Sequence, residues 1–416
     1  MDPSANAAVI IVFMLVYAGM ILGGIPGLAI DRTGVALLGA IALLAFGAVS
    51  IDDAWRAVDV PTIALLLGLM VVSAQFRLGG VYTRLTQRIA GANMPPPRLL
   101  GVLIGVSGAL SAVLANDIVC LAVAPILIDG CLRRRLNPLP FLLGLACASN
   151  VGSAATLIGN PQNMLIGQTL RLSFGGYLID ALAPSMIGLG IVWGVIAWCY
   201  RGRWMLDSIG TPVAGETVIS PQPFDRWQAA KGVAVVTALM GLFLFAPWPR
   251  EVVALGAAGV LLLSRKMASR QMLSLVDWQL LILFVGLFIV NHAVAASGLL
   301  DTLMGGVGHA GIDPARPAWL FVVVAVLSNL VSNVPAVMLL LPVADHPMSG
   351  AVLALSSTLA GNLIIVGSIA NIIVVDQAAR LGVRVSWIEH ARVGVPVTIL
   401  TLGVAGGWLL LLATLR

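Results

Sequence analysis

Apolar stretches follow one another along almost the whole chain, and short polar gaps separate them. They cover residues 7–24, 33–50, 61–77, 97–115, 117–131, 140–172, 182–200, 230–247, 251–264, 278–296, 317–332, 334–344, 350–375 and 393–414. Several approach the roughly 20 residues that a helix needs to cross the apolar core of a bilayer. The pattern predicts an all-α polytopic membrane protein.

Two pairs of apolar stretches meet at a single polar residue instead of a loop. Asn116 separates the first pair and Asn333 separates the second. Backbone that leaves a helix inside a bilayer must be buried in protein or line a cavity, because lipid offers it no hydrogen-bond partner. Each pair is therefore predicted to form a re-entrant hairpin, which enters and leaves the membrane by the same face. Its asparagine is expected to cap the returning helix.

Two other stretches, 140–172 and 350–375, are too long for one crossing and carry residues typical of a helix break. These residues are Gly159, Asn160 and Pro161 in the first stretch and Gly367 and Ser368 in the second. Asn160 directly before a proline suits an N-cap followed by proline at the first helical position, and Ser368 can cap in the same way. Such breaks bring helix N-termini, with their partial positive charge, to the middle of the bilayer.

The two halves of the chain resemble each other at a spacing of about 217 residues. Asn116 matches Asn333, and Gly159 matches Gly367 after a small change in length. We predict a first repeat at 1–200, a linker at 201–229 and a second repeat at 230–416. Each repeat then has five crossings and a hairpin. Because five is odd, the second repeat must be inverted, and inverted repeats are a signature of transporters.

The composition supports a membrane protein and excludes several other classes. Of the 416 residues, 59% are hydrophobic and only 10% are charged, against about 25% charged in soluble domains. This excludes a cytosolic enzyme, a disordered chain and a nucleic-acid binder. No metal, nucleotide or nucleophile motif can be read, so we expect no enzyme activity, no metal and no cofactor. The four cysteines are expected to be small buried side chains.

The distribution of positive charge predicts the orientation in the membrane. Cytoplasmic loops are enriched in Lys and Arg, and most of the 23 such residues fall on the face that carries the linker. We therefore expect both termini outside and the linker 201–229 in the cytoplasm of a bacterial or archaeal cell, in a multi-pass protein of the inner membrane. The chain begins without the basic stretch of a secretory signal, so its first apolar stretch is expected to remain as a span.

Asp117 indicates a function more clearly than any other residue. It is a carboxylate with apolar sequence on both sides, and an ionisable group in such a place is costly unless it is used. Beside helix N-termini it can exchange a proton during transport, whereas the alternative is a residue that merely caps the hairpin. Asp59 and Asp277 are interpreted as helix caps and His292 as a packing residue.

The candidate substrate-binding residues lie at the predicted hairpin tips and helix breaks. They are Asn116, Asn160, Asn163, Asn333, Ser332, Gly159, Gly367, Ser368 and Asn371. Symmetry is expected to gather both tips and both breaks around one central site. The alternative role for these residues is to satisfy backbone groups that the breaks leave unpaired.

Four sequence stretches resemble the ion transporter superfamily, which includes the arsenite permease family and the divalent anion/sodium symporters. They are LSAVLANDIVCLAVAP (110–125), ASNVGSAATLIGNPQN (148–163), LSNLVSNVPAVMLLLP (327–342) and STLAGNLIIVGSIAN (357–371). The resemblance covers nearly the whole chain and implies two inverted repeats, each with a re-entrant hairpin and a broken helix around the substrate. The symporters have Ser-Asn-Thr at both hairpin tips, whereas this chain has Ala-Asn-Asp at 115–117 and Ser-Asn-Val at 332–334. An Asn-Asp tip is more similar to the arsenite permeases.

These observations predict a secondary active transporter for a small inorganic solute, coupled to a proton or a sodium ion. The leading hypothesis is proton-coupled efflux of arsenite or antimonite. Its reason is that no Lys or Arg lies within the core of the predicted hairpins and broken helices, and a neutral metalloid acid needs only hydrogen-bond partners. The alternatives are a sodium- or proton-coupled symporter for anions (dicarboxylate, citrate or sulfate) and a sodium/proton antiporter. The expected partner is the lipid bilayer, and the sequence is compatible with a cytoplasmic ATPase partner and with a homodimer.

Overall fold

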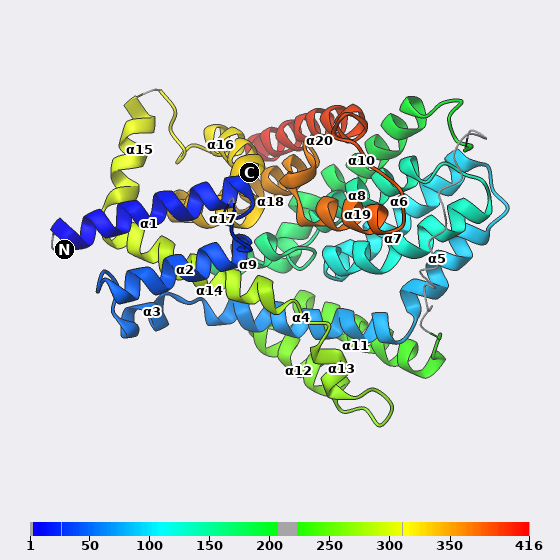
Figure 1. Ribbon diagram of the computed structural model, residues 1–416, viewed down its shortest axis with the longest axis horizontal. Coiled ribbons are helices and arrows are strands. Elements are labelled where there is room, and N and C mark those ends of the chain that lie inside the picture. Colours follow the sequence, from blue (N-terminus) through cyan, green and yellow to red (C-terminus); the bar gives the residue numbers. More distant parts are fainter. Residues whose placement is uncertain (1–2, 26, 207–222, 310, 416) are drawn as a thin grey trace.

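The computed structural model describes residues 3–25, 27–206, 223–309 and 311–415, and this part of the chain is helical with no strand (Figure 1). The first half contains α1 (Pro3–Leu22), α2 (Arg32–Ala45), α3 (Ile51–Ala57), α4 (Val60–Leu78), α5 (Val81–Gly91), α6 (Pro96–Val113), α7 (Asn116–Arg133), α8 (Leu139–Ser153), α9 (Pro161–Thr169) and α10 (Phe174–Cys199). Residues 207–222 of the predicted linker lie outside the described residues.

The described residues of the second half form the same number of α-helices and two short 3₁₀ turns. They are α11 (Arg226–Phe245), α12 (Arg250–Leu262), α13 (Ser269–Leu273), α14 (Trp278–Ala296), α15 (Leu299–His309), α16 (Pro317–Val331), α17 (Asn333–Leu340), η1 (Leu341–Val343), α18 (Ser349–Ala360), η2 (Ile365–Gly367), α19 (Ile369–Arg380) and α20 (Trp387–Leu415). The prediction of an all-α chain is confirmed.

Six helices among the described residues are long and apolar enough to cross a membrane. They are α4, α6, α10, α11, α14 and α20. Large apolar side chains on the outer helices, such as Trp193 on α10 and Ile399 on α20, are exposed, which suits a surface that faces lipid. The prediction of a polytopic membrane protein is confirmed. Because α6 is itself long enough to cross, the re-entrant course of the hairpins stays a prediction.

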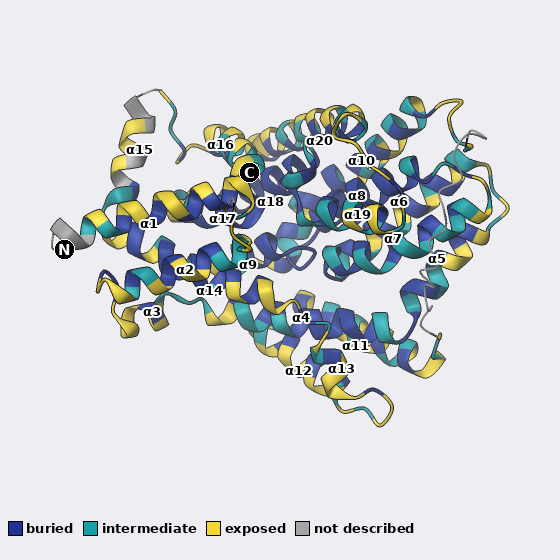
Figure 2. Ribbon diagram, in the orientation of Figure 1, coloured by how far each residue is buried: buried dark blue, intermediate teal, exposed yellow. Residues whose placement is uncertain are grey.

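Helices α8 and α18 form the centre of the bundle. Every residue from Pro140 to Ser153 in α8 and from Ser349 to Ala360 in α18 is buried. Figure 2 shows that buried residues concentrate in the middle of the molecule, whereas α1, α12 and α20 expose one side. The two broken segments therefore begin from fully enclosed helices.

The helices of the two halves correspond in chain order, α1 to α10 with α11 to α20. Asp59 and Asp277 show the match at atomic detail, because each accepts a 2.9 Å hydrogen bond from a backbone N–H in the first turn of its helix, Thr62 in α4 and Leu280 in α14. The interpretation of both as helix caps is confirmed. The repeat boundaries at 200 and 230 stay a prediction.

Two helix pairs join the halves through equivalent glycines. Helix α4 packs on α12 and α14 packs on α2. A Cβ atom on Gly68 would lie 2.7 Å from the carbonyl carbon of Ala254, and one on Gly286 would lie 2.8 Å from that of Ala36. Both crossings therefore bring backbone against backbone, which only a residue without a side chain permits.

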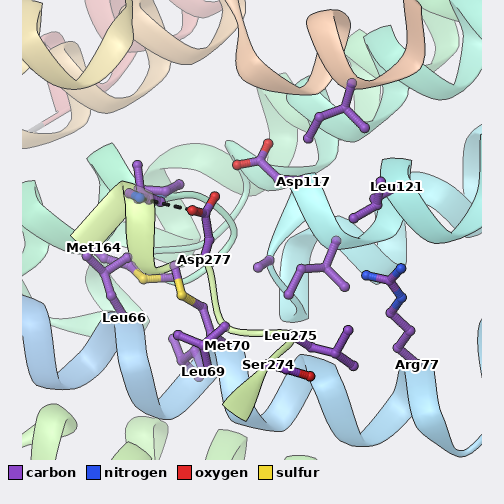
Figure 3. Close-up of a pocket in the computed structure, with 16 residues that line it drawn as sticks. Leu66, Leu69, Met70, Arg77, Asp117, Leu121, Met164, Ser274, Leu275 and Asp277 are labelled. Atoms are coloured by element: carbon purple, nitrogen blue, oxygen red, sulfur yellow. Dashed lines mark hydrogen bonds between the residues drawn. The ribbon is translucent and has the colours of Figure 1, made fainter. Parts of the chain in front are cut away.

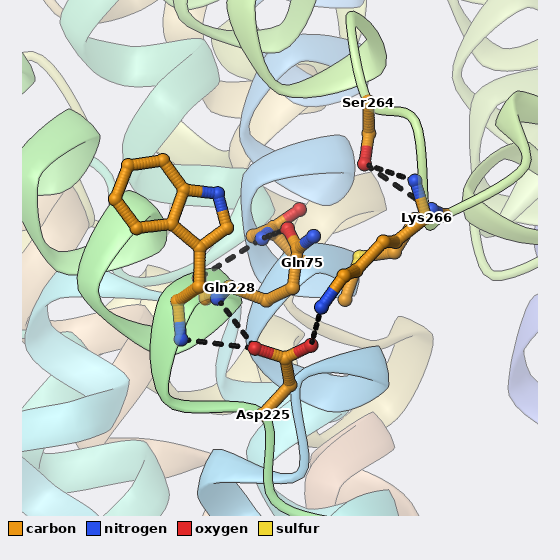
Figure 4. A network of polar contacts seen from close by, with 7 residues as sticks. Gln75, Asp225, Gln228, Ser264 and Lys266 are labelled. Atoms are coloured by element: carbon orange, nitrogen blue, oxygen red, sulfur yellow. Dashed lines mark hydrogen bonds and ion pairs between the residues drawn. The ribbon is translucent and has the colours of Figure 1, made fainter.

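The last described residues before α11 are tied to the helices by a polar network (Figure 4). Asp225 accepts hydrogen bonds from the N–H groups of Trp227 and Gln228 and pairs with Lys266 at 3.4 Å. The Gln228 N–H is the main cause that lowers the pKa of Asp225. Gln228 also accepts a 2.9 Å hydrogen bond from the buried Gln75 of α4. The start of α11 is therefore bonded both to α4 and to the segment that carries Lys266.

We expect Gly68→Ala and Gly286→Ala each to lower the free energy of unfolding by about 1–2 kcal/mol, because the overpacking cost exceeds the gain in helix propensity. Gly256→Ala, in α12 with open space around its Cβ position, should instead be neutral or stabilising. Thermal unfolding in detergent compares the three variants. Equal midpoints would contradict the close helix crossings.

Candidate functional site

The first break separates α8 from α9 and is built by asparagine side chains. Asn160 is the N-cap of α9, and its Oδ1 accepts a 2.9 Å hydrogen bond from the N–H of Asn163. The Nδ2 group of Asn163 donates to the Thr156 carbonyl at 3.0 Å. A Cβ on Gly159 would lie 2.3 Å from the Ser153 carbonyl oxygen. The predicted break and its Asn160 cap are confirmed.

The second break, between α18 and α19, repeats this construction with different side chains. Ser368 is the N-cap of α19, and its Oγ accepts a 3.2 Å hydrogen bond from the N–H of Ala370. Asn371 donates to the carbonyls of Gly361 at 2.8 Å and Ile364 at 3.2 Å. The prediction of this break and of the Ser368 cap is also confirmed. Asn163 and Asn371 thus close equivalent loops.

The hairpin tips lie against the breaks of their own repeats. The N–H of Asn116 donates to the Gly159 carbonyl at 3.2 Å. The amide of Asn333, oriented so that its nitrogen donates, reaches the carbonyls of Ser357 at 3.1 Å and Gly367 at 3.2 Å. Each hairpin tip is therefore docked on the break of its own repeat, and a single central site for both repeats stays a prediction.

The expectation that Asn116 and Asn333 cap the returning helices was wrong. Both are the first residues of their helices, the N-cap positions are Ala115 and Ser332, and no side chain caps either helix. The backbone N–H of Asn116 and the side chain of Asn333 are instead used to dock each tip on its break. Both asparagines make tertiary contacts. Local sequence cannot distinguish this role from helix capping.

A cavity of about 250 Å³ lies beside the first hairpin tip (Figure 3). Asp117 from α7 and Asp277, which precedes α14, both line it, and Arg77 of α4 lies on its wall. One oxygen of Asp277 is held by the Leu280 N–H. Apolar side chains, including Leu66, Met70, Leu121 and Met164, form much of the remaining surface. A carboxylate from each repeat therefore faces one mostly apolar chamber.

A second cavity of about 160 Å³ lies beside the other hairpin. Ser332 and Val334 line it, together with Arg32 and again Asp277. Val334 occupies the position that corresponds to Asp117, so the two chambers are related by the repeat but differ in charge. Asp277 borders both.

The sequence missed Asp277 and Arg77 as parts of the site. Both lie near helix ends, where capping and the membrane boundary explain a charge without any function. The only signal was the equivalence of Asp59 and Asp277, and it favoured a cap for both. His292, interpreted as a packing residue, is instead exposed on α14. Cys120 and Cys147 are buried, as expected, and line neither cavity.

Comparisons with known proteins agree with this architecture. Residues 8–356 match a family described as "Citrate transporter". An uncharacterized transporter of Mycobacterium tuberculosis is 30% identical over 399 residues, which are 90% of this chain and 92% of that protein. The silicon efflux transporter LSI3 of Oryza sativa is 27% identical over 445 residues, 90% of this chain and 91% of that protein.

The fold also has a counterpart among solved structures. The crystal structure of the YdaH transporter of Alcanivorax borkumensis aligns with a TM-score of 0.55 at 14% identity, over 99% of this chain and 98% of that one. At this identity the likeness concerns the fold alone.

We expect Asp277→Asn to be more stable than Asp59→Asn at alkaline pH, by up to about 1 kcal/mol. Asparagine caps a helix as well as aspartate does, so both variants keep the cap. Asp277 lines the same cavity as Asp117, whereas Asp59 lines neither cavity, so only the change at Asp277 relieves repulsion between two carboxylates. Thermal unfolding in detergent measures the difference, and an Asp117→Asn background should abolish it. An unchanged difference in that background would contradict the pairing.

Proposed function

We propose that this chain, which belongs to the citrate transporter family and is a membrane transporter, works by secondary active transport. Proton entry drives the efflux of a neutral metalloid acid. Arsenous and antimonous acid are the leading substrates. We place both termini outside the cell and the linker 201–229 in the cytoplasm of the inner membrane. The proposed substrate-binding residues are Asn116, Asn160, Asn163, Asn333, Ser332, Gly159, Gly367, Ser368 and Asn371.

The position of Asp117 carries the proposal of proton coupling. Its carboxylate lies at a hairpin tip, lines a largely apolar chamber and faces Asp277 from the other repeat. Two carboxylates in such a chamber favour the uptake of a proton, because protonation relieves both desolvation and repulsion. Loss of that proton on the opposite side of the membrane completes the coupling.

The polar groups of the tips and breaks suit a neutral, hydroxylated solute. Asn116 is buried, and its Oδ1 has no hydrogen-bond partner among the described residues, so it can accept a bond from a solute hydroxyl. The carboxylates of Asp117 and Asp277 outnumber the single guanidinium of Arg77 in the larger chamber, which disfavours a multiply charged anion. Silicic acid, the neutral acid of silicon, belongs to the same chemical class, and the rice relative is a silicon efflux transporter.

Citrate symport is the second candidate. The description of the family favours it, and Arg77 and Arg32 each line one chamber. An anion would then be bound with a cation that offsets the carboxylates of Asp117 and Asp277. The two candidates differ in the charge of the solute and can be separated by flux.

We expect purified protein in proteoliposomes to move arsenite in response to an imposed pH gradient, without sodium. Asp117→Asn should abolish the gradient-driven flux, because an amide cannot release a proton, while solute exchange at equal pH persists. Asp59→Asn is the matched control, since Asp59 caps α4 and lines neither cavity.

Arsenite, antimonite, silicic acid, citrate and succinate are compared as solutes, each with and without sodium. Gradient-driven flux that survives Asp117→Asn would remove the proton role. Citrate flux without any flux of neutral acids would replace the leading substrate class by the second.

A further inference from the structure

Asn150 on α8 and Thr358 on α18 occupy equivalent positions in the two repeats. They stand at the same spacing along the chain that relates Asn160 to Ser368. Both lie on fully enclosed helices, and their exposed fractions are 2% and 1%. Neither belongs to a break, to a hairpin tip or to the wall of either cavity described above, so we consider the hydrogen bonds that each makes.

Asn150 holds the break of the opposite repeat. Its Nδ2 group donates to Oδ1 of Asn362 at 2.8 Å and to Oδ1 of Asn371 at 3.1 Å. Its own Oδ1 accepts a 2.8 Å hydrogen bond from Oγ of Ser368. Ser368 is the cap of α19, and Asn371 closes the loop before it, so a first-repeat side chain orients both polar elements of the second break.

Thr358 makes the reciprocal contacts. Its Oγ1 accepts hydrogen bonds from Nδ2 of Asn160 at 3.3 Å and Nε2 of Gln162 at 3.2 Å, and it lies 3.3 Å from Oδ1 of Asn163, to which it can donate. Asn160 is the cap of α9, and Asn163 closes the first loop. A hydroxyl of the second repeat thus contacts the cap and the loop-closing asparagine of the first break.

We propose that Asn150 and Thr358 are positioning residues of the transport site, each setting the geometry of the other repeat's broken helix. This inference rests on the proposed function in taking the two breaks as the place where solute binds. Each side chain fixes the rotamer of a cap and of a loop-closing asparagine, and these in turn direct the N-terminus of a half-helix. The affinity of each half of the site is therefore determined by a residue of the opposite half.

Burial makes these contacts consequential. A buried donor or acceptor that loses its partner keeps its desolvation penalty without compensation, and each of these side chains forms hydrogen bonds with three others. A substitution at Asn150 or Thr358 leaves the capping residues Ser368 and Asn160 in the sequence. We therefore expect the break of the opposite repeat to lose its orientation, while the helix that carries the substitution stays packed.

The test uses Asn150→Leu and Thr358→Val in the full-length protein, with Thr358→Ser as the conservative variant. Thr398→Val is the matched control, because Thr398 is equally buried and its hydroxyl has no partner among the described residues. Hydrogen–deuterium exchange in detergent gives a readout that needs no substrate. We expect Asn150→Leu to increase exchange in peptides covering 361–371, and Thr358→Val to increase it in peptides covering 154–163.

Faster exchange confined to the altered residue's own repeat, or none in the opposite break, would overturn the inference, whatever the transport result. In arsenite flux, Asn150→Leu and Thr358→Val should raise KM at least about tenfold, which corresponds to about 1.4 kcal/mol. Thr358→Ser and Thr398→Val should keep the wild-type KM. If the wild-type protein moves no arsenite, the proposed function fails, and the exchange pattern still decides the reciprocal positioning.

Discussion

Unpaired backbone in an apolar surrounding is the constraint on which the rest of this structure depends. A helix that stops inside the bundle leaves N–H and C=O groups that neither lipid nor apolar side chains can satisfy. The chain meets this need with short amides and hydroxyls. Asn163 and Asn371 take up loop carbonyls, and Asn160 and Ser368 cap the helices that resume. In the function that we propose, the same polar groups also form hydrogen bonds with a small solute.

The two repeats are more alike in their backbone features than in the side chains that line the two chambers. Helix caps, glycine crossings and loop-closing asparagines recur at equivalent positions, because each is needed for backbone geometry. The side chains that face the chambers have diverged: an aspartate lines one chamber where a valine lines the other. The shared architecture therefore places a hairpin-tip carboxylate in one chamber only, while Asp277 borders both.

Local sequence was sufficient for features that are themselves local. The breaks could be predicted from Asn160 before a proline and from small residues inside over-long apolar stretches. The apolar stretches and the spacing of the repeats predicted the helical class. Local sequence was insufficient where a residue's neighbours come from another part of the chain. Asn116 looked like a cap because capping is the commonest local use of asparagine, yet its N–H docks on Gly159. Arg77 and Asp277 looked like boundary charges, since nothing local indicates which hairpin a helix end will face.

A single anion, Asp277, serves both chambers. A cation bound in one chamber would partly neutralise the charge of the Asp277 carboxylate. It would thereby weaken the attraction of that carboxylate for a cation in the other chamber. By thermodynamic reciprocity the antagonism must be equal in both directions. A cation in either chamber would therefore disfavour a second cation in the other, and this coupling would need no movement of the backbone.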